Sequence, residues 1–130
     1  WPPRLRKILE QYGLTTSVHR SFDKNNRLHI LKKHIEKGHP IIVLVTNPRT
    51  AKGRSRKIKG YVAWHWISVW GYDDEKEVFY VYDSYAHPKR HEQLPIGNVS
   101  IPFDRFKKEW RGEGLTRLFN YIYLPVLKKE

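Results

Sequence analysis

His65 and Asp83 are the residues of this sequence whose types and spacing could carry acid–base chemistry. Each lies in a run of aromatic and β-branched residues, Tyr61 to Tyr72 and Glu77 to Tyr85, and the acidic cluster Asp73 to Lys76 separates the two runs. This composition is typical of an antiparallel hairpin. An imidazole beside a carboxylate forms two thirds of a nucleophile–base–orienter triad, so the hairpin is the first candidate for a catalytic site.

The register of the hairpin decides whether the two side chains meet. Opposed residues of an antiparallel pair have a constant index sum, and a turn centred near Asp74 gives a sum of about 148 to 149. His65 is therefore predicted to lie opposite Asp83 or Ser84. At the lower sum the two side chains share a face with their Cβ atoms about 4.5–5.5 Å apart, and the carboxylate can orient the imidazole and stabilise its charged form.

A plainer interpretation of the same two residues is an ion pair on the surface of a hairpin, which contributes little. The surroundings of His65 favour a functional role. It lies within the hydrophobic run Val62 to Trp70, and a titratable group in such a run must be either satisfied by a partner or used. Trp64, Trp66 and Tyr85 would then border a cleft or pack in the core.

Three segments have the apolar periodicity of helices that bury one face. The first begins near Pro3 and is stopped by Gly13, and the second is stopped by Gly38. A cap from Asn25 or Asn26 is expected for the second helix. The three segments are Arg4 to Tyr12, Leu28 to Ile35, and Pro102 to Trp110.

Extended segments come between and after these helices. Ile41 to Thr46 is an unbroken apolar run, which is typical of a strand buried on both faces. We expect a loop from His87 to Val99 and a last strand from Leu118 to Leu124. Helices come first, mostly antiparallel strands follow, and no regular βαβ alternation is present, so the predicted fold class is α+β.

Several of these segments form a pattern that covers nearly the whole chain. They are Gly38 to Val45, His65 to Asp74, Val78 to Ser84, and Ile101 to Phe106 with Trp110. In their order and spacing they resemble the papain-like cysteine peptidases of the bacteriocin-leader-processing, or double-glycine peptidase, kind. The expected first helix is similar to the one which that family carries between its nucleophile segment and its sheet.

The resemblance implies a papain-like α+β fold, with a mostly antiparallel sheet and packed helices, in one domain over residues 1–130. It makes His65 the general base and Asp83 the group that orients it. The implied partner is a peptide or protein substrate, and no metal or cofactor is expected. In that family the nucleophile is a Cys at the start of an N-terminal helix, preceded by a Gln of the oxyanion hole. Gln11 and Gln93 lie in other contexts, and no Ser holds a matching position.

The sequence contains no cysteine and no methionine. One hypothesis is that the chain is the C-terminal two thirds of a cysteine peptidase, or of a closely related thiol acyl-transfer enzyme, whose Cys segment lies upstream of Trp1. The other is that it belongs to a protein that has lost the nucleophile and binds peptides without cutting them. Because a translated chain begins with Met, we favour the first. In both cases we expect no peptidase activity from these residues alone, since a His–Asp pair without a thiol cannot form an acyl-enzyme.

Composition keeps one further class open. A net charge of +12 attracts polyanions, and the basic residues gather between Asn47 and Gly60. A basic nucleic-acid-binding domain is therefore an alternative, although no recognised nucleic-acid motif is present and most aromatic residues alternate along strands as core residues do. No apolar stretch is long enough to span a membrane. Nonspecific polyanion binding is expected to involve Arg49, Arg54, Arg56, Lys57 and Lys59.

The remaining histidines raise the question of a metal site. His87 and His91 are four residues apart, but Pro88 between them argues against a shared helical face. His29 and His34 are five apart, which is a poor spacing for ligands on a helix. We expect solvated side chains rather than ligands for His19, His29, His34, His39, His87 and His91.

Overall fold

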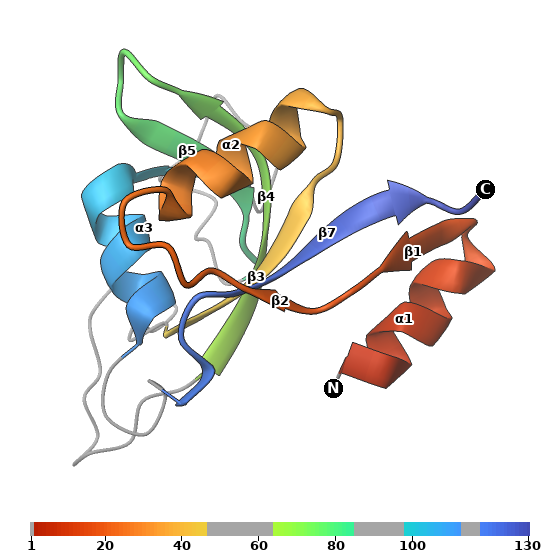
Figure 1. The fold of residues 1–130 in the computed structure, drawn as a ribbon. Helices are drawn as coiled ribbons and strands as arrows, with labels where there is room; N and C mark the ends of the chain where they lie inside the picture. Colours follow the sequence, from red (N-terminus) through yellow and green to blue (C-terminus); the bar gives the residue numbers. More distant parts are fainter. Residues whose placement is uncertain (1, 47–63, 85–97, 113–117) are drawn as a thin grey trace.

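The fold is that of a computed structural model, which describes all residues except 1, 47–63, 85–97 and 113–117 (Figure 1). The described residues form three helices and seven strands. The helices are α1 (Pro2–Gln11), α2 (Arg27–Glu36) and α3 (Phe103–Arg111). The strands are β1 (Leu14–Thr16), β2 (His19–Arg20), β3 (Ile41–Thr46), β4 (Trp64–Asp73), β5 (Val78–Tyr82), β6 (Asn98–Pro102) and β7 (Ile122–Lys128).

All strand pairs in the described sheet are antiparallel. The strand order is β1-β7-β3-β4-β5-β6, and β2 also pairs with β7. The predicted α+β class, with a mainly antiparallel sheet, is confirmed. Its central hairpin, β4 and β5, is the one that the aromatic runs predicted.

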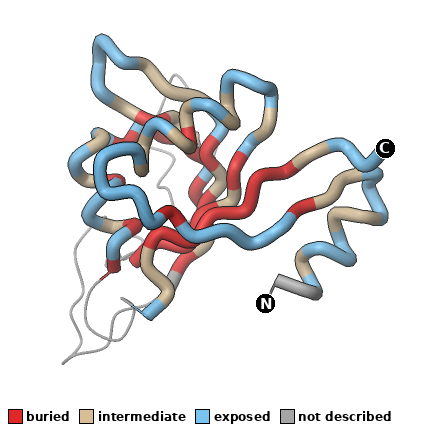
Figure 2. Tube along the Cα trace, in the orientation of Figure 1, coloured by how far each residue is buried: buried red, intermediate tan, exposed pale blue. Residues whose placement is uncertain are grey.

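Two helices cover one face of this sheet and enclose the core (Figures 1 and 2). Leu31 of α2 and Phe106 and Trp110 of α3 are almost fully buried against the strands. The Trp110 Nε1–H donates to the Ile122 carbonyl at 2.9 Å, so this buried indole is satisfied. The strands contribute alternate residues to this core, which are Ile41, Val43, Val45, Ile67, Val69, Phe79, Val81, Val99 and Ile101.

Helix α1 has a different role from the other two. It packs against β1 and, with β3 and β4, lines a cavity on the face of the sheet opposite α2 and α3. Its apolar stripe was expected to be buried, but Ile8 keeps 53% and Tyr12 keeps 76% of its surface exposed. The helix forms as predicted, but these two residues of its apolar stripe stay exposed.

The predicted helix stops act as left-handed residues. Gly13 has φ +73° and Gly38 has φ +79°, values that favour glycine. After α2, the Gly38 N–H donates to the Ile35 carbonyl and the His39 N–H donates to the His34 carbonyl, which is a Schellman motif. The predicted side-chain cap of α2 was wrong: Asn26 holds the cap position, but its amide donates to the Asp23 carboxylate instead.

The prediction for the last strand was also wrong. Strand β7 runs from Ile122 to Lys128 and passes through Pro125, whereas the sequence pattern favoured an end before that proline. Pro125 has no N–H to give to the ladder, but its carbonyl accepts the Thr16 hydroxyl at 2.7 Å. This hydrogen bond joins β1 to β7, but it does not replace the ladder bond that the proline cannot donate.

Three short strands were not predicted from the sequence patterns. These are β1, β2 and β6, and the last of them includes Asn98 and Val99, which were expected in a loop. They have only two to five residues each, too few for a clear alternation. The rest of that expected loop, and the basic segment from Asn47 to Gly60, lie outside the described residues.

Candidate active site

The side chains of His65 and Asp83 meet in the structure. His65 is the second residue of β4, and Asp83 directly follows β5. The His65 Nε2 lies 2.6 Å from the Asp83 Oδ1, within hydrogen-bond distance. Both residues are buried, with 8% and 7% of their surfaces exposed. Burial makes the contact more than an exposed ion pair, because a buried polar group without a partner is costly.

The register that brings them together differs from the predicted one. The index sum is 151 where Gly71 lies opposite Tyr80, and 150 where Val69 lies opposite Val81. The turn is therefore centred later than Asp74, and the predicted sum of about 148 to 149 was wrong. Extended to the end of the hairpin, the observed register places Asp83 opposite Ile67, so His65 and Asp83 are diagonal rather than direct neighbours. A diagonal pair on one face is still within reach of an imidazole and a carboxylate.

A β-bulge at Trp70 makes this shared face possible. Between Val69 and Gly71 the register shifts by one residue, and Trp70 is left without a residue opposite it. If Trp70 were paired and the ladder were regular, the pairing of Gly71 with Tyr80 would place Asp83 opposite Ser68, and Asp83 would point away from His65. The bulge moves the first half of β4 by one position, so His65, Ile67 and Val69 face the core together with Val81.

The pair lies on the core face of the sheet, beside α3. His65 is directly opposite Val45 in β3, and α3 packs against β3, β5 and β6. Glu109 of α3 lies close enough to both side chains for their charges to change its pKa. Burial raises the pKa of Glu109, and the nearby Asp83 carboxylate raises it further, while Arg105 and His65 lower it. Arg105 holds this carboxylate through an ion pair of 3.0 Å.

The geometry fits the base and the orienting group of a proton-transfer site. When His65 is neutral, its Nε2–H can donate to Asp83, and Nδ1 is then the basic nitrogen. An imidazole held in one tautomer by a carboxylate can take a proton from a nucleophile and return it to a leaving group. The 130 residues include no cysteine that could act as a nucleophile beside this pair.

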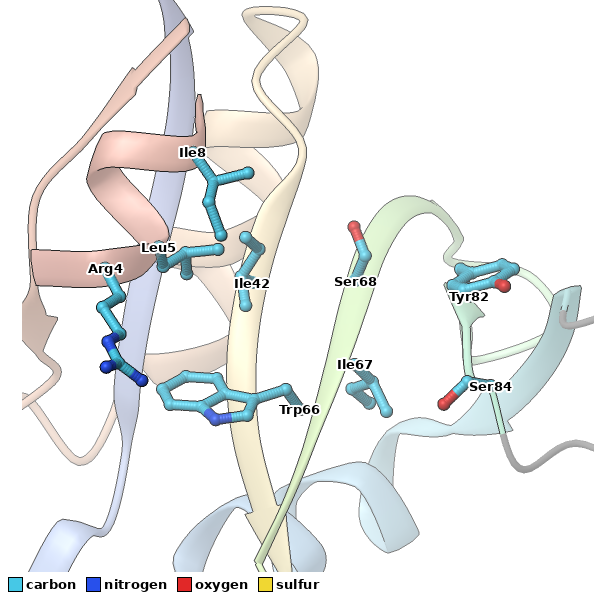
Figure 3. A pocket seen from close by; sticks show the side chains of 9 residues that line it. All are labelled: Arg4, Leu5, Ile8, Ile42, Trp66, Ile67, Ser68, Tyr82 and Ser84. Atoms are coloured by element: carbon cyan, nitrogen blue, oxygen red, sulfur yellow. The ribbon is translucent and has the colours of Figure 1, made fainter. Parts of the chain in front are cut away.

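Of the aromatic residues expected near a cleft, the structure places one. Trp66 borders a cavity of about 430 Å³ (Figure 3). Because successive side chains of a strand point to opposite faces, this cavity lies on the face of the sheet away from His65. The side chain of Trp64 and all of Tyr85 lie outside the described part of the structure. A second cavity of about 450 Å³ lies between α1 and the segment from Thr16 to Val18.

The expectation of solvated histidines was wrong for two of them. The His34 and His39 rings lie 6.2 Å apart between centroids, and the Nδ1 atoms of both are buried without a hydrogen-bond partner. The cause is the Schellman motif, which brings the side chains of these positions together. Burial lowers the pKa of His34, as do His39, Lys37 and His19. No group of three or more metal-ligating side chains is present in the described residues, and His87 and His91 lie outside them.

No helix in the described part of the chain is long and apolar enough to cross a membrane. The five cations expected to bind polyanions, Arg49, Arg54, Arg56, Lys57 and Lys59, lie outside the described ranges. Polyanion binding through them stays a prediction.

The family match and the fold define a peptidase-like α+β domain. The chain belongs to the Peptidase_C39 like family, whose model matches residues 2–114. The resemblance seen in the sequence is thus confirmed. Among solved structures, a C39-like peptidase from Bacillus anthracis has the same fold, with a TM-score of 0.55 and 14% sequence identity. The alignment covers 100% of this chain and 60% of that one, so this chain spans less than two thirds of that protein. No curated protein matches the sequence.

Two features near the site were not predicted from the sequence. Glu109 precedes a core tryptophan on an amphipathic helix, and its position four residues after Arg105 was the available signal. The bulge at Trp70 had no signal beyond the adjacent Gly71, because one extra residue in a strand leaves the hydrophobic run unbroken.

Proposed function

We propose that this chain is the base-bearing part of a cysteine peptidase domain, with His65 as general base and acid and Asp83 as the group that orients it. The single domain over residues 1–130 would be completed by a thiol on a segment upstream of Trp1. The observation that carries the proposal is the buried contact of 2.6 Å between the His65 Nε2 and the Asp83 Oδ1.

The proposed reaction is the hydrolysis of a peptide bond. The Nδ1 of His65 takes the thiol proton, and the sulfur attacks the carbonyl carbon. The imidazolium then gives its proton to the leaving amine as the C–N bond breaks, which leaves an acyl-enzyme. Water, deprotonated by the same imidazole, releases the acid and restores the thiol. Asp83 keeps Nε2 protonated throughout and stabilises the imidazolium.

Three observations support this proposal. The family match makes a peptide or protein the expected substrate class. The pair lies at the end of the β4–β5 hairpin that is remote from its turn. The half-buried ion pair of Arg105 and Glu109 on α3 adds a fixed charge distribution near the imidazole.

The test compares the 130 residues with the longer protein that includes the upstream segment. Peptide cleavage is expected from the longer protein and not from the 130 residues alone. In the longer protein His65→Ala should abolish turnover, and Asp83→Ala should lower kcat by about 10²–10⁴ while the fold is kept. Equal turnover in all three forms of the longer protein, or thiol-independent cleavage by the short chain, would remove the pair from the mechanism.

A peptide-binding domain without catalysis is the second candidate, and the lack of cysteine in these residues favours it. The same comparison separates the two functions. If the longer protein has no cysteine at the start of its upstream helix, and binds peptides without cleaving them, the second candidate is correct.

A further inference from the structure

The cavity between α1 and the sheet is a candidate binding site that is separate from the His65–Asp83 pair. It has a volume of about 430 Å³ and lies where α1 approaches strands β3, β4 and β5 (Figure 3). Trp66, Ser68, Tyr82 and Ser84 contribute the side chains that alternate with those of the core face. A ligand in this cavity would therefore lie across the sheet from His65.

The walls of the cavity are mostly apolar. Leu5 and Ile8 of α1 point towards Ile42 of β3, and the Trp66 indole closes one end (Figure 3). Ile8 is 53% exposed although it belongs to the apolar stripe of its helix. An apolar side chain of a ligand would cover this surface and gain about 25 cal/mol for each Å² removed from water.

The polar groups of the cavity lie at opposite ends. The Arg4 guanidinium lies beside the Trp66 ring, and the Ser68 and Ser84 hydroxyls lie on the side of β4 and β5 (Figure 3). No hydrogen bond or ion pair involves these three side chains within the described residues. The first turn of α1 has no acidic side chain to neutralise Arg4. Arg6 differs in this respect, because its Nε lies 3.2 Å from the Glu10 carboxylate.

We propose that this cavity binds the free C-terminal carboxylate of a peptide that ends in an apolar residue. Arg4 offers the planar fork that pairs with a carboxylate through two hydrogen bonds. The apolar side chain of the terminal residue fills the space between Leu5, Ile8 and Ile42. The hydroxyls of Ser68 and Ser84 bind the amide groups that precede it.

A peptide and a fatty acid both offer an apolar part and a carboxylate. The serine hydroxyls favour the peptide. An alkyl chain would cover Ser68, which is already half-buried, and would leave its hydroxyl without a partner. A peptide offers donors and acceptors at that end. The cavity therefore fits the peptide better, and the fatty acid is the comparison ligand for the test.

The experiment measures binding to the 130-residue chain by calorimetry and follows the Trp66 indole N–H by NMR. The probes are N-acetyl-Ala-Ala-Leu, the same peptide as its C-terminal amide, and octanoate. We expect the acid to bind with a dissociation constant on the order of 1 mM or below and the amide to bind about tenfold more weakly. Octanoate should also bind more weakly than the acid.

Matched variants assign the affinity to particular groups. Arg4→Gln should weaken the acid to the level of the amide and leave the amide unchanged, whereas Arg6→Gln should change neither. Ser68→Ala should weaken the peptide acid about threefold without weakening octanoate. His65→Ala should have no effect, which separates this site from the proposed catalytic pair.

Several results would overturn the proposal. These are no binding of the acid, equal binding of acid and amide, octanoate bound as tightly as the peptide, or equal losses in Arg4→Gln and Arg6→Gln. The last would mean that the overall positive charge attracts the ligand. Arg4 is exposed, so its replacement leaves the fold intact, and an amide NMR spectrum of each variant verifies this.

Discussion

Trp70 stacks on Tyr80, with 5.3 Å between the ring centroids and 24° between the planes, although Tyr80 lies opposite Gly71 in the register. The stacking fixes the bulged residue on the outer face of the hairpin, where Trp70 is 45% exposed. The part of β4 before Trp70 is therefore shifted by one residue relative to the part after it. The buried His–Asp contact at the far end of the hairpin depends on this shift.

Replacing Trp70 and inserting a residue before Val69 should therefore have different effects. Trp70→Ala removes the stacking but keeps the residue count, and we expect a loss of about 1 kcal/mol in unfolding free energy with the pair intact. An alanine inserted between Ser68 and Val69 turns Ile67 and His65 out of the core, so we expect a loss of at least about 3 kcal/mol. Urea unfolding of both variants checks this. An insertion variant as stable as Trp70→Ala would contradict the register of β4 and β5.

The contact between His65 and Asp83 predicts one tautomer for the neutral ring. With Asp83 as acceptor, the proton is expected on Nε2, and ¹⁵N NMR of labelled histidine should show this form. Asp83→Ala should abolish the preference and lower the unfolding free energy by about 1–3 kcal/mol, because a buried ring nitrogen loses its partner. Asp104→Ala removes an exposed carboxylate of α3 and serves as the control. A ring protonated mainly on Nδ1 in the native chain would refute the assignment.

Breaking the ion pair between Arg105 and Glu109 should lower the unfolding free energy by an amount that depends on pH. Burial already raises the pKa of Glu109, and Arg105→Gln should raise it further. A folded-state pKa above the unfolded one gives a penalty that grows as pH rises from about 4.3 through the folded value. We expect a loss on the order of 1 kcal/mol near pH 7 and a smaller one near pH 4.

A second substitution isolates this effect. In a Glu109→Gln background the buried group is neutral at every pH, so Arg105→Gln should then show no growth of its effect with pH. Urea unfolding at the two pH values measures all four proteins. A loss that is the same at both pH values would show that Arg105 acts through packing alone.

His34 should make the fold weaker in acid. Burial, the nearby His39, Lys37 and His19 hold its pKa below the ordinary value, so the unfolded chain binds the proton more readily. Its stability contribution is complete above about pH 6.5 and is lost as pH falls through the folded-state pKa. His34→Asn should flatten the dependence of unfolding free energy on pH in this range. His29→Asn, an exposed change on the same helix, should keep the full dependence, and equal slopes for both variants would exclude His34 as the cause.

Much of the fold could be predicted from periodicity, because long segments have clear patterns. Strand β3 was predicted with its observed bounds, and α1 and α3 within two residues. The short strands β1 and β2 could not be predicted, since they exist only through pairing with β7, which lies about a hundred residues away along the chain. Pro125 misled the prediction of β7, because proline cannot donate to the ladder and is rare inside a strand that is paired on both sides.

For the candidate site, the sequence predicted which two residues meet but not how they meet. The hairpin register was wrong because turn position depends on local backbone geometry, such as the positive φ of Glu77. The error left the pairing intact, since the turn shift and the bulge together preserve the face on which His65 lies. The cavity beside Trp66 needs α1 and the sheet in their packed positions, and no local pattern reports that.

The pairing of strand β7 also determines when the sheet can be completed during synthesis. It pairs with β1, β2 and β3, and the Lys129 N–H donates to the Gly13 carbonyl, so the first and last segments of the chain depend on each other. During synthesis, the early strands leave the ribosome long before their partner exists. Until β7 emerges, one side of β3 has no neighbouring strand and its unpaired backbone edge is exposed to other molecules. We therefore expect nascent chains of this protein to need protection by chaperones until β7 has been synthesised.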